Sequence, residues 1–359
     1  MYDMDKKEII IVTISLGNDG AERVLSELAN EWASSGHQVT VVQTRPNAYG
    51  CEYTLSERIE QLQIEAPGRY KIIRYLREIF KLVKILKKRP EACAVSFLSA
   101  SSFILAVSSW FTKNRLIFSE RNNPRECPAG IYQQILRNFA FYFADVCVFQ
   151  TEDAKQYFSR AIQKKGVIIP NPVKGDLPKR HTGERRKAVI TACRLHPQKN
   201  LKMMIDAFVM FHREFREYKL EIYGQGVLEK ELKEYTVSLG AEEYILFLGF
   251  EPHIEDKMAD CSIYISSSDY EGISNSMLEA MGMGLPVVVT DCPVGGARMV
   301  IENGKNGILV PVGDARALYL GMKEIIQNPE FAKTISQNAS LIRYQFPLKK
   351  IAGKWIEYM

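Results

Sequence analysis

The chain has 359 residues, enough for about two domains of common size. Hydrophobic residues make up 46% of the sequence and charged residues 25%, which excludes disordered, collagen-like and disulfide-scaffold proteins. The formal net charge is +5, from 47 basic and 42 acidic side chains. A surplus this small does not by itself indicate a nucleic-acid-binding protein.

The sequence predicts neither a membrane span nor an exported protein. Its apolar stretches fall short of the ~20 residues that a spanning helix needs. The start, residues 1–8, is charged, and the apolar run at 9–14 is too short for a signal-peptide core. The seven cysteines form no C-x-x-C pair, which is typical of buried thiols in a reducing compartment. We therefore expect a cytoplasmic protein.

The first half of the chain alternates short apolar runs with longer amphipathic stretches, a pattern typical of βαβ units and a parallel sheet. The first predicted helix covers residues 21–35. Strands are expected over residues 8–15, 38–44, 93–97, 116–119, 146–150 and 167–169.

A linker follows, because residues 170–178 are rich in Pro and Gly and residues 179–187 are charged and unpatterned. The alternation then restarts. Strands are expected over residues 188–192, 220–223, 245–248, 262–266 and 287–290, and helices over 201–215, 227–239 and 277–283. From residue 318 the pattern is helical, and the last helix is expected over 348–358.

The fold class that this pattern predicts is α/β, with two Rossmann-like, doubly wound domains facing a central cleft. The expected boundaries are residues 1–172 for an N-terminal domain and 173–343 for a C-terminal domain. Residues 344–359 are expected to form a helix that packs back toward the N-terminal domain. In such sheets, ligands bind at the carboxyl ends of the strands.

Two glycine-bearing turns follow predicted strands. Gly20 lies between the first strand and the first helix, where it either lets the backbone approach an anion or serves a tight structural turn. Gly224 lies in a similar turn of the second half. The first turn lacks a full G-x-G-x-x-G motif and no acidic residue ends the second strand, which disfavours nicotinamide cofactors.

Arg194 and Lys199 lie five residues apart in the loop after the first strand of the second half. Such a pair can hold a diphosphate from two sides, the arginine through bidentate hydrogen bonds and the lysine as a point charge. A solvated surface pair is the alternative, and the position at a strand end favours the binding role.

The most specific motif spans Glu271 and Glu279, which are eight residues apart and flank a small, polar turn before an apolar helix. One carboxylate can bind ribose hydroxyls and the other a sugar hydroxyl, and amides of the turn can bind phosphate. The turn residues are Gly272, Ile273, Ser274, Asn275 and Ser276.

Residues 68–89 carry nine Lys or Arg and one Glu, and nine less one leaves a surplus of eight positive charges, more than that of the whole chain. The apolar residues recur at helical spacing beside a basic face. The segment is either an amphipathic helix that packs on the first sheet with a solvated basic side, or one whose basic face rests on anionic lipid.

Metal and nucleophile chemistry have little support in the sequence. The one D-x-D motif, Asp3 to Asp5, lies upstream of the first strand, and the five histidines form no ligand pair. No G-x-S-x-G nucleophile motif occurs. We therefore expect no metal and no cofactor, with basic side chains and helix N-termini supplying the charge that phosphates need.

These motifs resemble those of the nucleotide-sugar-dependent retaining glycosyltransferases of family 4, which have the GT-B fold, and the resemblance covers nearly the whole chain. Residues 20–25 look like the family's opening glycine loop, Arg194 and Lys199 like its R-x4-K clamp, and Glu271 with Glu279 like its E-x7-E element. Residues 303–310 are similar to its terminal NG-x-NG-x-LV strand entry. The Asn18-Asp19-Gly20 turn departs from the paired glycines of many members.

The resemblance implies that Glu279 binds the ribose of the nucleotide, that Glu271 contacts the donor sugar, and that the reaction retains the anomeric configuration. Arg194, Lys199 and Glu271 are the predicted catalytic residues. A UDP-linked hexose or N-acetylhexosamine is the expected donor, by the habit of the family. The resemblance also implies that the C-terminal domain, 173–343, binds the nucleotide sugar and that the N-terminal domain, 1–172, binds the acceptor. Residues 117–124 resemble a segment of members that build bacterial surface and lipid-linked glycans, such as capsule or O-antigen.

Glu120, Arg121 and Asn122 of that segment are therefore predicted to contact the acceptor, although a surface turn ended by Pro124 is the alternative. Residues 68–89 would place the enzyme on the inner face of the membrane. Two other functions stay open: a sugar-nucleotide 2-epimerase of the same architecture, and a non-catalytic basic nucleic-acid-binding protein. The first needs acid and base residues beyond the two glutamates, and the second leaves the clamp unexplained.

Overall fold

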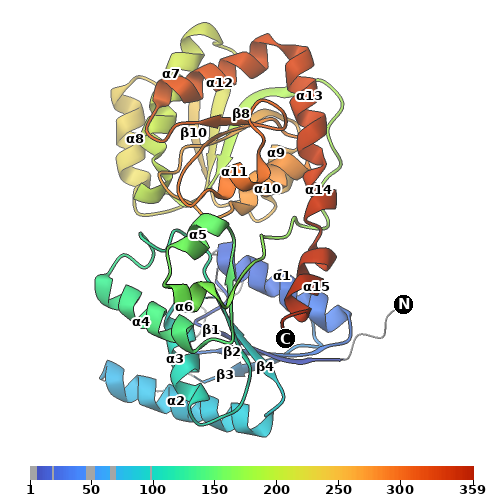
Figure 1. Ribbon diagram of the computed structural model, residues 1–359. Coiled ribbons are helices and arrows are strands. Elements are labelled where there is room, and N and C mark those ends of the chain that lie inside the picture. The colour runs from blue at the N-terminus through green and yellow to red at the C-terminus, as the bar shows by residue number, and fades with distance from the viewer. Residues whose placement is uncertain (1–5, 18–19, 46–52, 65–69, 98) are drawn as a thin grey trace. The chain divides into compact units, whose positions relative to one another are not determined.

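The computed structural model describes residues 6–17, 20–45, 53–64, 70–97 and 99–359. The chain divides into two compact units, Met1–Pro172 with Leu348–Met359 and Val173–Pro347. Each unit is a parallel sheet covered by helices (Figure 1). Among the described helices, none is both long and apolar enough to cross a bilayer.

Unit 1 is built on a seven-stranded parallel sheet of order β3-β2-β1-β4-β5-β6-β7. Its central strands are fully buried, as parallel strands covered on both faces must be. The strands are β1 (Glu8–Thr13), β2 (Gln38–Gln43), β3 (Glu60–Gln63), β4 (Cys93–Ser96), β5 (Leu116–Ser119), β6 (Val146–Phe149) and β7 (Gly166–Ile168).

The helices of unit 1 cover both faces of this sheet, because the crossover direction reverses at β1 and crossovers are right-handed. They are α1 (Gly20–Ser34), α2 (Lys71–Lys88), α3 (Ser99–Ser109), α4 (Ile131–Phe143), α5 (Glu152–Gln156), α6 (Arg160–Gln163) and α15 (Leu348–Ile356). Helices α1 and α15 pack together, while α3 packs between α2 and α4 (Figure 1).

The C-terminal helix α15 is anchored in unit 1 by an aromatic cluster. The Trp355 ring lies 6.2 Å from Trp32 of α1 and stacks on Phe97 at 5.2 Å. The indole nitrogen of Trp32 also donates to the carbonyl of Ala352 at 3.2 Å. Residues at the end of the chain therefore complete the core of the first unit.

Helix α2 lies within the basic segment as expected, but it does not pack through its whole apolar stripe. Its buried side chains are Glu78, Leu82 and Leu86. Glu78 is held by ion pairs with Arg45 and Arg74. The expectation that the apolar stripe packs on the sheet is therefore wrong for its N-terminal half, because the buried carboxylate takes that place. Residues 68 and 69 of the predicted segment lie outside the described residues.

Unit 2 has a six-stranded parallel sheet of order β10-β9-β8-β11-β12-β13. Two apolar cores cover its two faces. The strands are β8 (Arg186–Ala192), β9 (Lys219–Tyr223), β10 (Ile245–Gly249), β11 (Cys261–Ser266), β12 (Val287–Thr290) and β13 (Ile308–Val310).

One core of unit 2 lies beneath α7 and α12, and the other beneath α10 and the helices that follow α12. The helices are α7 (Leu201–Glu214), α8 (Glu229–Ser238), α9 (Ile254–Met258), α10 (Asn275–Gly282), α11 (Gly296–Val300), α12 (Ala315–Gln327), α13 (Pro329–Ser340) and α14 (Ile342–Gln345). A single 3-10 turn, Pro197–Lys199, precedes α7.

Candidate functional site

The predicted donor residues follow strands whose carboxyl ends share one edge of the unit-2 sheet. Strands β8, β11 and β12 run parallel and are neighbours, so the loops that begin after Ala192, Ser266 and Thr290 emerge together. The two halves of the predicted motif, 193–200 and 267–276, therefore lie beside each other. This is the edge at which open α/β sheets bind ligands.

An ion pair joins these loops. The Lys199 ammonium donates to the Glu271 carboxylate, and the side chains are only 13% and 21% exposed. The Ser268 hydroxyl donates to the same carboxylate at 3.3 Å. Burial alone would lower the pKa of Lys199, but the neighbouring Glu271 carboxylate more than offsets it, and the pKa is raised. The site therefore holds a fixed positive charge beside a carboxylate.

Four further hydrogen bonds brace the lysine loop against the glutamate loop. The Asn200 amide donates to the carboxylate of Asp269 at 2.7 Å, and the Asp269 amide N–H donates to the carbonyl of Gln198 at 2.9 Å. The Gln198 side chain donates to the carbonyl of Tyr270 at 2.9 Å, and the Ser267 hydroxyl to the carbonyl of Lys199 at 2.7 Å. The two loops are therefore held as one unit.

These bracing residues were not singled out in the sequence. Gln198 and Asn200 flank the clamp lysine, and Asp269 precedes the motif glutamate by two residues, so a polar flank was their one visible signal. Asn200 has a left-handed backbone, with φ of 43°, and its side chain also caps α7. Because asparagine tolerates that conformation better than most residues, its presence there has a local cause.

Gly224 allows the loop after β9 to approach the clamp loop. Its φ is +127°, and a Cβ atom at this position would lie 1.9 Å from the carbonyl oxygen of Cys193. Any other residue would therefore push the two loops apart. The glycine predicted as part of a ligand turn has a demonstrable structural role here.

The turn before α10 has the shape that the motif predicts, although the helix begins earlier. It starts at Asn275 rather than 277, so Glu279 lies in its second turn, not its first. The Ser274 hydroxyl caps the helix by accepting the N–H of Met277 at 3.4 Å. Glu279 is 1% exposed. Gly272 and Ile273 are buried, whereas Ser274, Asn275 and Ser276 are half-buried.

Arg194, the other residue of the predicted clamp, lies on the same loop as Lys199 and is exposed. Its carbonyl accepts the N–H of His196 at 2.9 Å, which tightens the loop before the 3-10 turn. The structure thus brings Lys199 to Glu271 and leaves the guanidinium of Arg194 at the surface of unit 2.

The predicted acceptor segment of unit 1 is held mainly by its own contacts. Glu120, after β5, is 8% exposed and accepts the N–H groups of Arg121 at 3.0 Å and Asn122 at 3.2 Å. Its other oxygen lies 3.4 Å from the buried guanidinium of Arg137. Burial raises the pKa of Glu120 to about 7, against the opposing effect of Arg137.

Arg121 continues this network, since it bonds to the side chain of Asn171 and lies 4.8 Å from the ring centre of Phe97. Burial lowers its pKa to about 9. Asn122 is half-buried and donates to the thiol of Cys127 at 3.2 Å. The buried Glu120 carboxylate therefore holds this loop in place through its hydrogen bonds, and Arg121 and Asn122 are less buried.

The opening glycine turn is described in part. Gly20 is exposed and is the first residue of α1, while Asn18 and Asp19 lie outside the described residues. Near it, the Ser15 hydroxyl donates to Glu22 at 3.0 Å. These contacts order the described side of the turn around a buried carboxylate.

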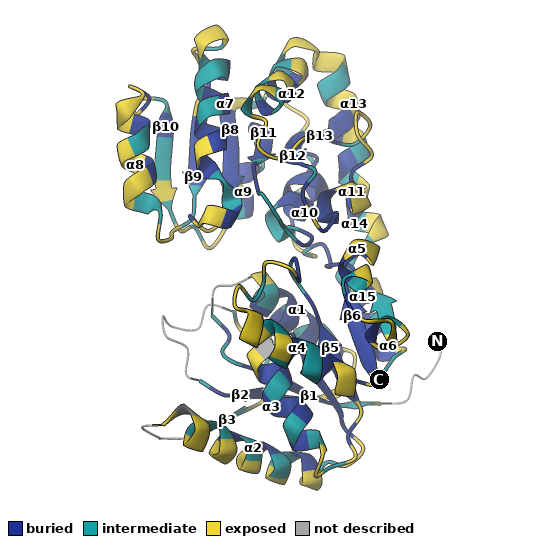
Figure 2. Ribbon diagram, turned by 60° about the vertical axis from the view of Figure 1, so that its left-hand side comes forward, coloured by how far each residue is buried: buried dark blue, intermediate teal, exposed yellow. Residues whose placement is uncertain are grey.

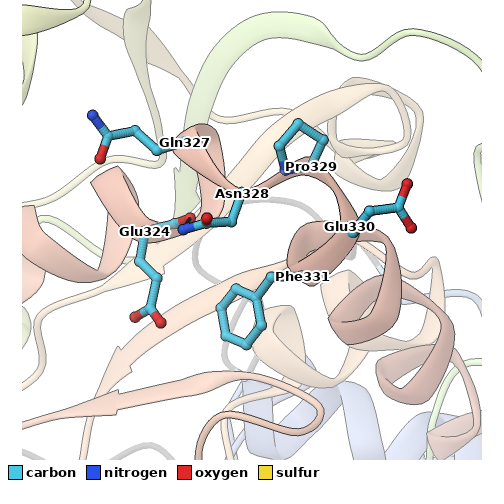
Figure 3. Close-up of a pocket in the computed structure, with 6 residues that line it drawn as sticks. All are labelled: Glu324, Gln327, Asn328, Pro329, Glu330 and Phe331. Carbon is cyan, nitrogen blue, oxygen red and sulfur yellow. Dashed lines mark hydrogen bonds between the residues drawn. The ribbon is translucent and has the colours of Figure 1, made fainter.

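Two further features bear on metal and ligand binding. Within the described residues, no group of three His, Cys, Asp or Glu side chains is placed to hold a metal ion; Asp3 and Asp5 lie outside those residues. A hollow at the junction of α12 and α13 includes none of the predicted site residues (Figure 3). It is lined by Glu324, Gln327, Asn328, Pro329, Glu330 and Phe331.

The chain matches known families, and its fold matches known structures. Residues 175–341 match the family described as Glycosyl transferases group 1, and residues 18–176 match Glycosyltransferase Family 4. The chain is similar over 98% of its length to the Anabaena protein Alr3699/HepE, whose structure contains UDP, with 21% identity, 98% of that chain covered and a TM-score of 0.82.

Sucrose-phosphate synthase from Thermosynechococcus elongatus is a further structural neighbour, with 14% identity, 98% of each chain covered and a TM-score of 0.83. The two sheets, their helices and these neighbours define the GT-B fold. Since the two family matches together run from residue 18 to 341, the chain belongs to glycosyltransferase family 4.

Two curated relatives from Campylobacter jejuni match nearly the whole chain. The first, N-acetylgalactosamine-N,N'-diacetylbacillosaminyl-diphospho-undecaprenol 4-alpha-N-acetylgalactosaminyltransferase, is 26% identical over 97% of this chain and 98% of its own length. The second, a GalNAc-alpha-(1->4)-GalNAc-alpha-(1->3)-diNAcBac-PP-undecaprenol alpha-1,4-N-acetyl-D-galactosaminyltransferase, is 24% identical over 99% of this chain and 98% of its own length.

Proposed function

We propose that the protein transfers a hexose or N-acetylhexosamine from a UDP-linked donor to a hydroxyl group of a growing, lipid-linked cell-surface polysaccharide, with retention of anomeric configuration. The observation that carries the proposal is the braced Lys199–Glu271 pair at the carboxyl edge of the unit-2 sheet. The names of the Campylobacter jejuni relatives support the lipid-linked acceptor, and the UDP of the Anabaena neighbour supports the donor nucleotide.

The basic and acidic donor residues bind different parts of the nucleotide sugar. Lys199 and Arg194 hold the diphosphate, the amides of Ile273 to Ser276 at the start of α10 add hydrogen bonds to it, and Glu271 and Glu279 accept hydroxyl groups of the sugar and the ribose. The raised pKa of Lys199 keeps its ammonium charged where the leaving diphosphate develops negative charge. We propose that no metal ion or other cofactor is needed for this.

The proposed chemical step makes use of these residues. The acceptor hydroxyl oxygen forms a bond to C1 of the donor sugar while the bond from C1 to the diphosphate oxygen breaks on the same face. The leaving diphosphate takes the electron pair of that bond and also the hydroxyl proton. Substitution of Arg194 or Lys199 by alanine therefore lowers turnover by about 10²-fold or more, the scale of losing one charge-stabilising group.

The test is UDP release from UDP-glucose, UDP-galactose and their N-acetylated counterparts, with and without a polyprenyl-diphosphate-linked glycan. We expect release that depends on the acceptor, and a new α-linkage from an α-linked donor by NMR. Acceptor-independent formation of the 2-epimer would instead identify a sugar-nucleotide epimerase. Near-normal turnover in both alanine variants would overturn the assignment of the clamp.

A further inference from the structure

Helix α2 exposes large apolar side chains along one face. Ile72, Leu76 and Phe80 recur at intervals of four residues and are 74%, 61% and 61% exposed. Ile73 beside them is 42% exposed. Figure 2 shows α2 with a continuous exposed side along its length. Solitary exposed apolar residues are ordinary, but a row of them on one helix marks a contact surface.

The neighbouring helices of the same layer add to this surface. At the end of α3, Trp110 and Phe111 are more than half exposed, and Trp110 packs edge-on to Phe143 of α4 at 5.7 Å. On α4, Ile131 and Ile135 are 78% and 59% exposed. We call this set the α2–α4 face. It consists of Ile72, Leu76, Phe80, Trp110, Phe111 and Ile135.

The charge next to the apolar row is of one sign. Arg77, Lys81, Lys84, Lys87 and Lys88 of α2 are all exposed. The Lys84 ammonium lies 4.4 Å from the ring centre of Phe80, so basic and apolar side chains are intermixed.

Acidic residues do not balance these charges on the three helices. Their sequences contain one acidic residue, Glu78, which is fully buried and already paired. The exposed charges of α2, α3 and α4 are therefore all positive.

We propose that the α2–α4 face binds an anionic lipid bilayer, with its apolar side chains in the boundary between headgroups and acyl chains and its basic side chains against lipid phosphates. A helix with an apolar face flanked by Lys and Arg lies in such an interface, and exposed Trp is suited to its depth. This deepens the proposed function by naming the part of the enzyme that meets a lipid-linked acceptor.

Two other occupants fit less well. A second copy of the chain would bring one basic helix close to another, which like charges oppose. A nucleic acid would attract the lysines but would leave the exposed isoleucine, leucine and phenylalanine side chains of α2 without apolar contact. Of these three occupants, anionic lipid matches both the charge and the apolar character of the surface.

The α2–α4 face also has a useful position within unit 1. Helices α2 and α4 each begin after a strand of the parallel sheet has ended, so their N-termini lie at the edge where the strands end. The loop of Glu120 to Asn122 begins at that same edge, directly after β5. A bilayer that covers the α2–α4 face would extend to this edge and bring lipid headgroups close to the predicted acceptor segment.

The experiment is cosedimentation of the full chain with vesicles of phosphatidylcholine alone or mixed with phosphatidylglycerol, at low and high salt. We expect binding to the anionic vesicles and little to the neutral ones. The apolar variant I72S/L76S/F80S and the charge variant K81E/K84E/K88E should each bind the anionic vesicles at least about tenfold more weakly than the parent. Both apolar burial and charge contribute to binding at such an interface.

Matched controls lie on unit 2. V227S/V237S removes exposed apolar side chains, and K179E/K230E/K333E reverses exposed lysines, so both should bind like the parent. Circular dichroism and thermal unfolding establish that each variant is folded. Because the α2 side chains are outside the donor site, UDP-sugar should stabilise all variants as it does the parent.

Three results would overturn the proposal: equal binding to neutral and anionic vesicles, unchanged binding by both α2 variants, or a parent dimer in analytical ultracentrifugation that the apolar variant abolishes. Salt-sensitive binding to duplex DNA without vesicle binding would do the same. Vesicle binding is measured without donor or acceptor, so its failure is distinguishable from a failure of the transferase activity.

Discussion

Replacement of Lys199 by methionine tests the donor site most directly, because it removes the ammonium and keeps an unbranched side chain. Loss of one group that stabilises the leaving diphosphate should lower turnover by about 10²- to 10³-fold, or about 3–4 kcal/mol in the barrier. Lys199→Arg keeps the positive charge and should retain more activity than the methionine variant. The assay is the initial rate of UDP release at saturating donor and acceptor.

The same variant has a separate effect on stability. It leaves the Glu271 carboxylate, 21% exposed, without its ammonium. Surface pairs are worth up to about 1 kcal/mol and disruption of buried pairs costs about 3–5 kcal/mol. We therefore expect this half-buried case to cost about 1–3 kcal/mol of unfolding free energy. Adding Glu271→Gln should recover part of that stability but not the turnover.

The pH dependence of the unfolding free energy follows from the raised pKa of Lys199. A raised pKa in the folded state gives stability that is complete below the unfolded value, about 10.4, and is lost as pH rises through the folded value. The contribution of Lys199 to the unfolding free energy should therefore be constant from neutral pH to about pH 9 and fall only above the ordinary lysine range.

A K199M variant that keeps more than about a tenth of parental turnover would refute the assigned role in charge stabilisation.

Three other predictions concern residues around the two sites. Glu120→Gln should flatten the pH dependence of the unfolding temperature between about pH 4.5 and 7. Burial raises the pKa of Glu120 to about 7, so ionisation of this carboxyl weakens the folded state as pH rises through that window. An unchanged slope would contradict the raised pKa. Asn200→Ala should lower the unfolding free energy by about 1–2 kcal/mol and also lower turnover, because the helix cap and the hydrogen bond to Asp269 are lost. Asn200→Gly should cost less stability and still lower turnover; denaturant unfolding and UDP release measure the two effects. Gly224→Ala should unfold at a lower temperature than the parent because its Cβ would meet a carbonyl at 1.9 Å, while Gly353→Ala, with open space, should be neutral or stabilising in the same melts.

The order of most strands could be predicted from the apolar pattern of the sequence, and two strands could not. β13 was indicated only by the resemblance of residues 303–310 to the strand entry of the family. Predicted strands such as 116–119 and 287–290 coincide with β5 and β12, because buried parallel strands need apolar residues throughout. β3 was missed since its residues, Glu60 to Gln63, are polar. It is an edge strand that pairs only with β2, and its side chains are mostly exposed, so no apolar pattern marks it.

The sequence also indicated that the segments of Lys199 and Glu271 each follow a strand, and it could not say that these two side chains meet. Lys199 and Glu271 are 72 residues apart, and their contact depends on the pairing of β8 with β11. The bracing role of Asn200 and Asp269 has the same cause, because their hydrogen bond spans 69 residues. The sequence near each residue therefore does not predict these long-range contacts.

The periodic alternation of apolar and amphipathic segments thus determined two doubly wound α/β units, the linker near residue 173 and the loops that carry the donor motif. Burial of a parallel sheet on both faces leaves few other arrangements for such a pattern. Only the tertiary structure decided which side of α2 is buried. Its helical period offers several faces. The buried face is the one on which Glu78 pairs with Arg45 and on which Leu82 and Leu86 lie, and Ile72, Leu76 and Phe80 point outward.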